Sequence, residues 1–473
     1  MAVESARASH CDLSHNIPVP DSFRTSQCGE TRKAKQCDVE IGGEHPNMKT
    51  TWFMTSMLMV GETMGTGILG LPGAAATLGW TLAIATLVMF AFFSSFSGCL
   101  LAKVKTVYYP NAAGFADLAN VTVGPRFKKF TRVLIIANWT LLLPYYIISA
   151  GSSMQGIVQS TKLCGWVSSL IAAALYLVPT QFTTLKYISY LCVPSTITIV
   201  VAAVMIIVSL FVDADPSRHF GDNTELGVTL DDTQSPFLSF FQFYSAFSSF
   251  VFAYQGQDMF VEMMDEMEEP REAAKAVSFS YVFMTLSYAL TVIAAYGNDG
   301  KSVPGYLPDA LKEGTTKAIV SSLILFHVLV AYVITSNLVG KFFYSLAFPS
   351  TALISTWSKD WFEGLTVRAR WLLVQSGLLI LAYLLANLIP AFGAMQGLIG
   401  SLCGAPIVFG YPPLFYLLAH RQHGDAVDCF HNAVCWLFLT VMLPSLTILG
   451  TIGAIITIVQ YFESDAISMP FSC

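Results

Sequence analysis

The stretch GETMGTGILGLPGAAATLGW, from Gly61 to Trp80, lies inside a run of residues apolar enough to cross a membrane. It combines one carboxylate, Glu62, with the helix breakers of Gly65–Gly67 and Pro72. Backbone that is not helical is tolerated at membrane depth only where it lines a cavity inside the protein. An acid within a span is costly and faces the bundle interior or water. The stretch therefore predicts a broken membrane helix with a functional site at the break.

The composition is that of an integral membrane protein. Hydrophobic residues make up 54% of the 473 residues and charged residues only 12%, whereas roughly 25% of an ordinary soluble chain is charged. The net charge of -6 gives no reason to expect a nucleic-acid partner. The sequence has no Walker-type phosphate loop and no His, Cys and Asp cluster at metal or nucleophile spacing. We therefore expect neither an enzyme nor an ATP-driven pump, and no cofactor or metal.

Apolar runs separated by loops predict an all-α integral membrane protein with eleven transmembrane helices. They cover residues 51–77, 80–102, 128–160, 165–183, 187–212, 236–264, 273–296, 317–346, 368–389, 392–418 and 431–461. With the N-terminus in the cytosol, 20 of the 25 lysines and arginines fall on the cytosolic side, as the positive-inside rule requires. The odd number of spans places the C-terminus on the extracytosolic side.

Two tails flank the predicted transmembrane domain of residues 49–462. The polar segment 1–48 carries basic clusters such as RKAK and reads as a disordered cytosolic tail. Residues 463–473 form a short extracytosolic tail. Of the ten scattered cysteines only Cys164 and Cys473 fall on the outer side, so one disulfide is compatible with this topology.

A second break is expected in span six, in the sequence FAYQGQD from Phe252 to Asp258. The two breaks lie five spans apart, and an odd spacing gives the two five-helix units opposite orientations. The units would be inverted repeats at about 51–212 and 236–418, followed by an extra helix at about 431–461. Matching interrupted segments in two halves point to the binding site of a secondary transporter. The alternative is that the glycines only allow helices to pack closely, as small residues often do in membranes.

Unwound backbone has the chemistry to bind a zwitterionic ligand. The positive ends of half-helices at their N-termini suit a carboxylate, and carbonyls without helical partners suit an ammonium group or a cation. Glycine adds unusual dihedral angles and lets a ligand approach the backbone closely.

The segments GTGILGLPGAAATLGW and FAYQGQDMFVEMMDEMEEPREAAKA together resemble the amino acid/auxin permease family, and look similar to its fungal neutral amino acid permeases. Two more matching segments, TSNLVGKFFY and IPAFGAMQGLIGSLCGAPIVFGYPPLFYL, extend the resemblance over about Thr50 to Tyr461. The resemblance implies a fold of the leucine-transporter type with a 5+5 inverted repeat, broken helices one and six, and an eleventh helix. It also implies secondary active transport of amino acids, coupled to protons in fungal and plant members and to sodium in some animal ones.

The resemblance implies a substrate site at the two breaks. The residues carried over are Gly65, Thr66 and Gly67 of span one and Phe252, Tyr254, Gln255 and Gly256 of span six. Tyr145 or Tyr146 of span three would be a further contact, although ordinary packing explains these tyrosines equally well. Phe252 and Tyr254 beside glycines favour neutral side chains in the substrate.

A coupling ion, H+ or Na+, is implied by the same resemblance. A cation would meet the carbonyls of Gly61 and Met64 and the hydroxyls of Thr335 and Ser336, because hard cations prefer oxygen ligands. A Thr-Ser pair in a helix also commonly bonds back to the preceding turn. Sodium-coupled relatives often have an asparagine where this chain has Gly61, which favours the proton.

Glu62 is the expected proton-coupling residue. Burial disfavours the charged form of a carboxyl group, which suits a group that binds and releases protons. The alternatives are that Glu62 lies at the cytosolic water level or pairs with a basic residue. Asp258 and Glu262 after the second break are candidates to share the role, and His327 in span eight is interpreted as a packed residue.

These observations favour an amino acid permease that works by alternating access. The competing hypothesis is a receptor that binds an amino acid and signals through the tail 1–48 without transport. The expected partners are an amino acid substrate and membrane lipid, with no obligatory protein partner. We expect the plasma membrane rather than a vacuolar or other internal membrane, and the sequence does not decide which amino acid is carried.

Overall fold

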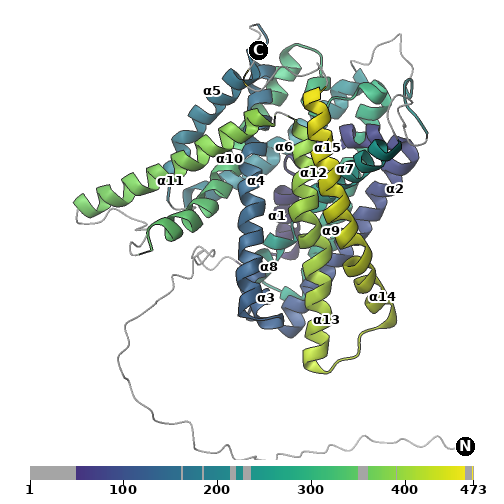
Figure 1. Cartoon of the computed structure of the whole chain (residues 1–473), viewed down its shortest axis with the longest axis vertical. Coiled ribbons are helices and arrows are strands. Elements are labelled where there is room, and N and C mark those ends of the chain that lie inside the picture. Colours follow the sequence, from purple (N-terminus) through teal and green to yellow (C-terminus); the bar gives the residue numbers. More distant parts are fainter. Residues whose placement is uncertain are drawn as a thin grey trace, which may run out of the picture. The chain divides into compact units, whose positions relative to one another are not determined.

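The computed structural model describes residues 49–160, 163–183, 186–212, 220–226, 236–349, 361–389, 391–463 and 471. The predicted tail 1–48 and most of the tail 463–473 lie outside these residues. The regular secondary structure of the described residues is helical, apart from a single backbone bridge between Thr50 and Met267. The all-α prediction is therefore confirmed for these residues (Figure 1).

The α-helices are these, in chain order: α1 (Trp52–Met64), α2 (Gly67–Lys103), α3 (Phe115–Thr122), α4 (Pro125–Ile157), α5 (Gly165–Leu177), α6 (Lys186–Val212), α7 (Pro236–Tyr254), α8 (Gln257–Asp265), α9 (Ala273–Asp299), α10 (Thr315–Ala347), α11 (Trp361–Leu388), α12 (Phe392–Ile399), α13 (Tyr411–His423), α14 (Cys429–Leu437) and α15 (Gly450–Glu463). Wider π-helical turns join α12 to α13 and α14 to α15, so each pair forms one continuous rod. Figure 1 shows these two rods lying side by side.

Nine helical stretches in the described residues are long and apolar enough to cross a membrane. The expected eleven differ from this number at two places. The first predicted span is divided between α1 and the beginning of α2, and α5 has only 13 residues. Gly79, at φ 72°, bends α2 where the sequence predicts the boundary between spans one and two. Glycine adopts such a left-handed conformation at no steric cost.

Local sequence signals explain several helix boundaries. The Thr51 hydroxyl accepts a hydrogen bond from Met54 N and caps α1. Gly124, at φ 128°, turns the chain before Pro125, which begins α4 at a position where the missing N–H costs nothing. Gly424 adopts the left-handed conformation that ends α13.

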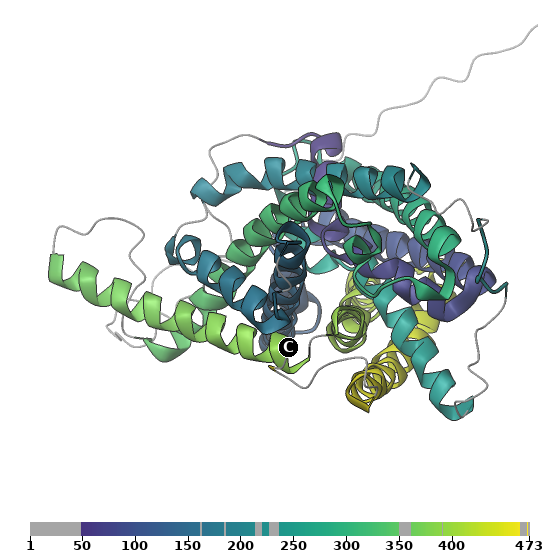
Figure 2. The same ribbon diagram turned by 90° about the horizontal axis from the view of Figure 1, so that it is seen from above.

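The helices pack in two groups. In the first, α2 contacts α7 and α9, and α1 contacts α9. In the second, α4 contacts α5, α10 and α11, and α6 lies against α10. Figure 2 shows the helices of the transmembrane unit from above. Helices α1, α2 and α7, which flank the predicted breaks, belong to the first group.

Cys164, just before α5, is disulfide-bonded. The other described cysteines, Cys99, Cys192, Cys403, Cys429 and Cys435, are free. Cys473, the expected partner of Cys164, lies outside the described residues.

Candidate functional site

The first break lies where the sequence predicts it. Helix α1 ends at Met64, α2 begins at Gly67, and Gly65 between them has φ -5° and ψ -124°. A Cβ added to Gly67 would lie 3.1 Å from the Cα atom of Ala253 in α7. Only a glycine lets the two backbones come this close, so the GTG motif serves the contact between the two broken helices.

The second break lies between α7 and α8, at Gln255 and Gly256. A Cβ added to Gly256 would overlap the hydroxyl of Thr63 in α1. Each break therefore packs its glycine against the other broken helix. The two breaks that the sequence places five spans apart lie side by side in the structure.

Side chains from three other helices donate hydrogen bonds to backbone carbonyls at the two breaks. Tyr145 of α4 donates to Thr66 O over 3.1 Å, and Gln396 of α12 donates to Gly67 O over 3.1 Å. At the end of α7 two tyrosines of α9 do the same: the hydroxyls of Tyr288 and Tyr281 donate to Ala253 O and Tyr254 O over 2.7 and 2.9 Å. In this conformation the protein thus binds carbonyls on both sides of the contact between the breaks.

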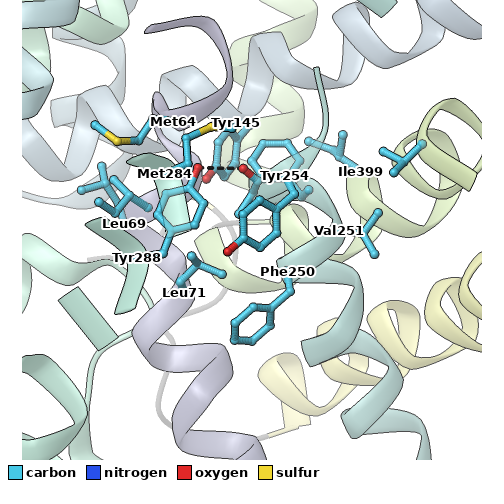
Figure 3. Close-up of a cluster of buried hydrophobic side chains, with 14 of the residues drawn as sticks. Met64, Leu69, Leu71, Tyr145, Phe250, Val251, Tyr254, Met284, Tyr288 and Ile399 are labelled. Atoms are coloured by element: carbon cyan, nitrogen blue, oxygen red, sulfur yellow. Dashed lines mark hydrogen bonds between the residues drawn. The ribbon is translucent and has the colours of Figure 1, made fainter. Parts of the chain in front are cut away.

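Aromatic rings line the contact between the breaks. The ring of Tyr145 stacks on Phe392 of α12, with centroids 4.4 Å apart, and meets Phe252 of α7 edge-on at 5.2 Å. Figure 3 shows Tyr145 in one cluster of buried side chains with Met64 and Tyr254. Tyr145 and Phe252 were both predicted from the sequence, whereas Phe392 was not.

Two predicted substrate residues of span six direct their polar atoms away from the first break. The Tyr254 hydroxyl lies 3.2 Å from Thr285 Oγ1 on α9. Gln255 Nε2 donates to Asn138 Oδ1 of α4 over 3.0 Å. Asn138 in turn lies 3.5 Å from Asp258 Oδ2 in the first turn of α8, where the helix dipole favours a carboxylate.

Three buried acceptors beside the breaks have no hydrogen-bond partner among the described residues. They are Thr63 Oγ1, Gln255 Oε1 and Gln396 Oε1. Buried polar atoms are nearly always paired, so unpaired ones need an explanation. A ligand with N–H donors, such as an ammonium group, would supply the missing partners.

The ion-coupling candidates lie around Glu62. Its side chain is exposed, and it is close enough to Tyr146 and Asp258 to interact with them electrostatically. Thr335 of α10 lies beside the Tyr146 hydroxyl. The alternative that Glu62 pairs with a basic residue is not observed, because no ion pair in the described residues includes it.

The residues of the expected cation cage have other contacts. The Ser336 hydroxyl donates to Val333 O in its own helix over 3.2 Å. Gly61 packs on α6, where an added Cβ would lie within 3.0 Å of the Thr196 side chain. Met64 is buried in the core. The Ser336 hydrogen bond is the back-bonding to the preceding turn that Ser and Thr commonly make in helices. The contact of Gly61 with α6 is ordinary helix packing.

His327 lies closer to the first break than its interpretation as a packed residue implies. It is buried, and its Nδ1 lies 2.9 Å from Ser195 Oγ on α6. Its Nε2 faces Gly65, 3.4 Å from where a Cβ would stand. The sequence signal for this residue, and for Asn138 and Gln396, is a polar side chain in an otherwise apolar span.

Glu262 has a structural partner. Its carboxylate accepts a hydrogen bond from Phe115 N over 3.2 Å and so caps the N-terminus of α3. Gly114, the residue before α3, has no side chain to do this. Of the two acids predicted after the second break, Asp258 and Glu262, the second therefore has a structural role as a helix cap.

Comparisons with known proteins identify the family and several similar proteins. Residues 48–456 match the family model of transmembrane amino acid transporter proteins. The chain is 22% identical to the N amino acid transport system protein of Neurospora crassa, over 89% of this chain and 88% of that protein. It is 22% identical to the vesicular inhibitory amino acid transporter of Xenopus tropicalis, over 75% of this chain and 67% of that protein. A solved Na+-coupled sialic acid symporter, substrate-bound and outward-open, overlaps with a TM-score of 0.48 at 11% identity, covering 86% of this chain and 90% of that one.

The family match covers most of the chain and confirms the resemblance seen in the two glycine-containing segments. The helices long and apolar enough to cross a membrane make it a multi-pass membrane protein. It is a transporter of amino acids and not an enzyme. This chain belongs to the family of transmembrane amino acid transporter proteins.

Proposed function

We propose that this chain carries neutral amino acids across its membrane by alternating access and that protons drive the transport. The observation that carries the proposal is the direct contact of the two broken helices, with Gly67 against Ala253 and Gly256 against Thr63. Unwound backbone from two helices at one point in a membrane protein provides positive helix ends for the carboxylate of a zwitterion.

The surroundings of the breaks fit an amino acid. The N-termini of α2 and α8 offer positive dipole ends to its carboxylate. The unpaired oxygens of Thr63, Gln255 and Gln396 suit its ammonium group. The aromatic rings beside them suit an uncharged side chain, which supports neutral substrates.

Alternating access would move the group of α1, α2, α7, α8 and α9 against the rest of the bundle. Both ends of the site are tied in this conformation. At one end the Tyr306 hydroxyl lies 2.7 Å from Ser153 Oγ of α4. At the other, Thr50 N donates to Glu266 O over 2.9 Å, and Glu268 N donates to Thr50 O over 2.8 Å. We expect the transport cycle to release one of these two sets of contacts at a time.

The proposal also includes the topology expected from the sequence, with eleven spans and two inverted five-helix repeats.

Proton coupling is proposed for Glu62. Its side chain is exposed beside the first break, and no basic residue among the described ones pairs with it. Sodium bound by Gly61, Met64, Thr335 and Ser336 is the competing ion.

The proposed orientation has a cytosolic N-terminus and an extracytosolic C-terminus, in the plasma membrane. The disulfide at Cys164 supports it, because disulfides persist in oxidising compartments. Cys164 precedes α5, at the end of the bundle that the distribution of lysines and arginines places outside.

Uptake of labelled amino acids into proteoliposomes tests this function. A proton gradient and a sodium gradient are imposed separately, and wild type is compared with Glu62→Gln, Thr335→Ala and the control Glu313→Gln. Glu313 is an exposed acid in the loop before α10, so its loss removes the same charge far from the breaks. We expect saturable, proton-driven uptake of neutral amino acids that is lost in Glu62→Gln alone.

Uptake driven by sodium and lost only in Thr335→Ala would move the coupling to the hydroxyls of α10. Amino acid binding without any uptake or exchange would favour the receptor hypothesis. Counterflow by Glu62→Gln, measured with substrate on both sides and no gradient, separates a loss of coupling from a loss of folding.

A further inference from the structure

A groove of about 370 Å³ lies on the flank of the bundle, and none of the residues at the two breaks line it. It forms where the end of α2, the beginning of α9 and the beginning of α14 meet. The residues that line it are Phe96, Cys99, Leu100, Ala102, Lys103, Thr106, Val107, Arg271, Ala274 and His431. Three of these side chains can carry positive charge and none carries a carboxylate.

The two long basic side chains of the groove have no carboxylate partner in the described residues. Lys103 Nζ instead lies 3.2 Å from the Tyr416 hydroxyl, which holds it at the groove. Neighbouring lysines are paired: Lys105 Nζ lies 2.6 Å from Asp265 Oδ1, and Lys275 Nζ lies 3.3 Å from Glu272 Oε1. Lys103 and Arg271 are thus cations that the protein leaves available to an external anion.

His431 differs from these two residues. Its Nδ1 lies 3.3 Å from an Asp428 oxygen, and this contact lowers the pKa of the Asp428 carboxyl. The imidazole is thereby held at the edge of the groove, with its ring 5.4 Å from that of Phe96. His431 shapes the groove, and Lys103 and Arg271 supply its charge.

The rest of the groove is apolar. Phe96 and Leu100 lie one turn apart on α2, and Val107 and Ala274 continue the apolar surface. The ring of Phe96 also contacts Phe430, which is 56% exposed. A ligand that fills this groove therefore carries both an anionic group and a hydrocarbon chain.

The position of the groove narrows the choice of ligand. Lys103, Arg271 and the beginning of α14 all lie at the end of the bundle that the distribution of basic residues places in the cytosol. Basic pockets between membrane helices on this side bind lipid head groups. The groove also opens beside the N-terminus of α9, whose dipole favours an anion.

We propose that this groove binds an anionic glycerophospholipid of the cytosolic leaflet, with its phosphate between Lys103 and Arg271 and an acyl chain along Phe96 and Leu100. A zwitterionic phospholipid fits less well, because its cationic head group would face two cations. The site is separate from the proposed amino acid site and does not depend on the coupling ion.

Native mass spectrometry of the full-length protein, released from nanodiscs that contain equal amounts of phosphatidylserine and phosphatidylcholine, tests the proposal. We expect phosphatidylserine to be retained preferentially. The double variant Lys103→Gln/Arg271→Gln should bind it about thirtyfold more weakly, since each basic residue near a membrane surface contributes about fivefold. The control Lys128→Gln/Lys129→Gln removes the same charge from the beginning of α4 and should bind normally.

A second variant tests the shape of the groove without a change of charge. Ala274→Phe fills it from α9 and should also lose the retained phosphatidylserine. Melting temperatures in phosphatidylcholine alone, equal to that of wild type, show that the variants fold.

Three results would overturn the proposal. Equal retention of the two lipids would mean that the groove does not select anions. Unchanged binding in the double variant would place the lipid elsewhere. Displacement of phosphatidylserine by inorganic phosphate at equal concentration would mean that the groove recognises a free anion rather than a lipid.

Discussion

At the scale of single residues, the glycines of the breaks lack a side chain and so allow the two broken helices to come close together. Gly67 lies at the beginning of α2, where its backbone touches Ala253 of the other broken helix. Glycine is expected at such a point because any Cβ would push the two helices apart. The same reasoning applies to Gly256, which faces Thr63.

We expect Gly67→Ala to reduce uptake strongly and to destabilise the protein by about 1–3 kcal/mol, the usual cost of overpacking. The added methyl would lie 3.1 Å from the Ala253 Cα atom, and backbone cannot move aside as a flexible side chain does. The melting temperature and the initial rate of uptake measure the two effects. The control is Gly377→Ala in α11, where nothing lies within 4 Å of the new methyl. Wild-type uptake by Gly67→Ala would show that the close approach is not needed for transport.

Tyr145 holds the first break through its hydroxyl. We expect Tyr145→Phe to lower the uptake rate at low substrate concentration about fivefold, because it removes a hydrogen bond to a buried carbonyl, which contributes about 1 kcal/mol. The carbonyl concerned is Thr66 O, 3.1 Å from the Tyr145 hydroxyl. Tyr176→Phe is the matched control, since the buried Tyr176 hydroxyl has no partner in the described part of the chain. Equal rates for the two variants would rule out a role for this hydrogen bond.

Tyr254 shows the limit of sequence reasoning at this scale. The family resemblance implies that it contacts substrate, yet its hydroxyl lies against Thr285 of α9. A residue next to a break is identifiable from the sequence, but the rotamer that its side chain adopts depends on the helix packed against it.

At the scale of elements, the end of α8 is fastened to its surroundings by several bonds. Lys105 Nζ lies 2.6 Å from Asp265 Oδ1 and also donates to two backbone carbonyls, those of Pro110 and Ala112, over 2.7 Å each. Its side chain is 3% exposed, whereas that of Asp265 is 46% exposed. The half-helix α8 is therefore tied to the segment that follows α2.

We expect Asp265→Asn to destabilise the protein by about 2 kcal/mol, because it leaves a buried lysine without its counter-ion; full burial of both partners would cost more. Hydrogen exchange of the α8 amides should become faster, which reports loosening of this half-helix. Asp117→Asn breaks the more exposed pair with Lys128 and should cost about 1 kcal/mol or less. Unchanged exchange in α8 would mean that the backbone pairing at Thr50 is sufficient to hold it.

The positions of the breaks were predictable, but their partners were not. GTG and QG end helices for local reasons that are visible in the sequence. The side chains that donate hydrogen bonds to carbonyls at the breaks come from positions far along the chain, such as Gln396 and Tyr288. No local pattern connects these residues to the breaks.

At the scale of the whole molecule, the proposed topology places the two ends of each span on opposite sides of the membrane. Between the loop before α10 and the beginning of α14 the chain crosses three times, in α10, in α11 and in the rod of α12 and α13. Lys312 and Cys429 should therefore face opposite sides.

We expect a membrane-impermeant maleimide to label Lys312→Cys in intact cells, and Cys429 only after permeabilisation, each in a background without other free cysteines. Cys429 is exposed and free at the beginning of α14. Labelling of both sites in intact cells would contradict three crossings. Labelling of Cys429 alone would invert the proposed orientation.

The sequence by itself determined that this is a multi-pass helical membrane protein, that its helices break at Gly65–Gly67 and at Gln255–Gly256, and which family it resembles. These properties depend on hydropathy and on local backbone preferences, which neighbouring residues in the chain control. Only the tertiary structure decided that the two breaks touch through Gly67 and Gly256, that His327 faces Gly65, and that Lys103 and Arg271 share one groove. These relations arise because helix packing brings together residues that lie far apart in the chain.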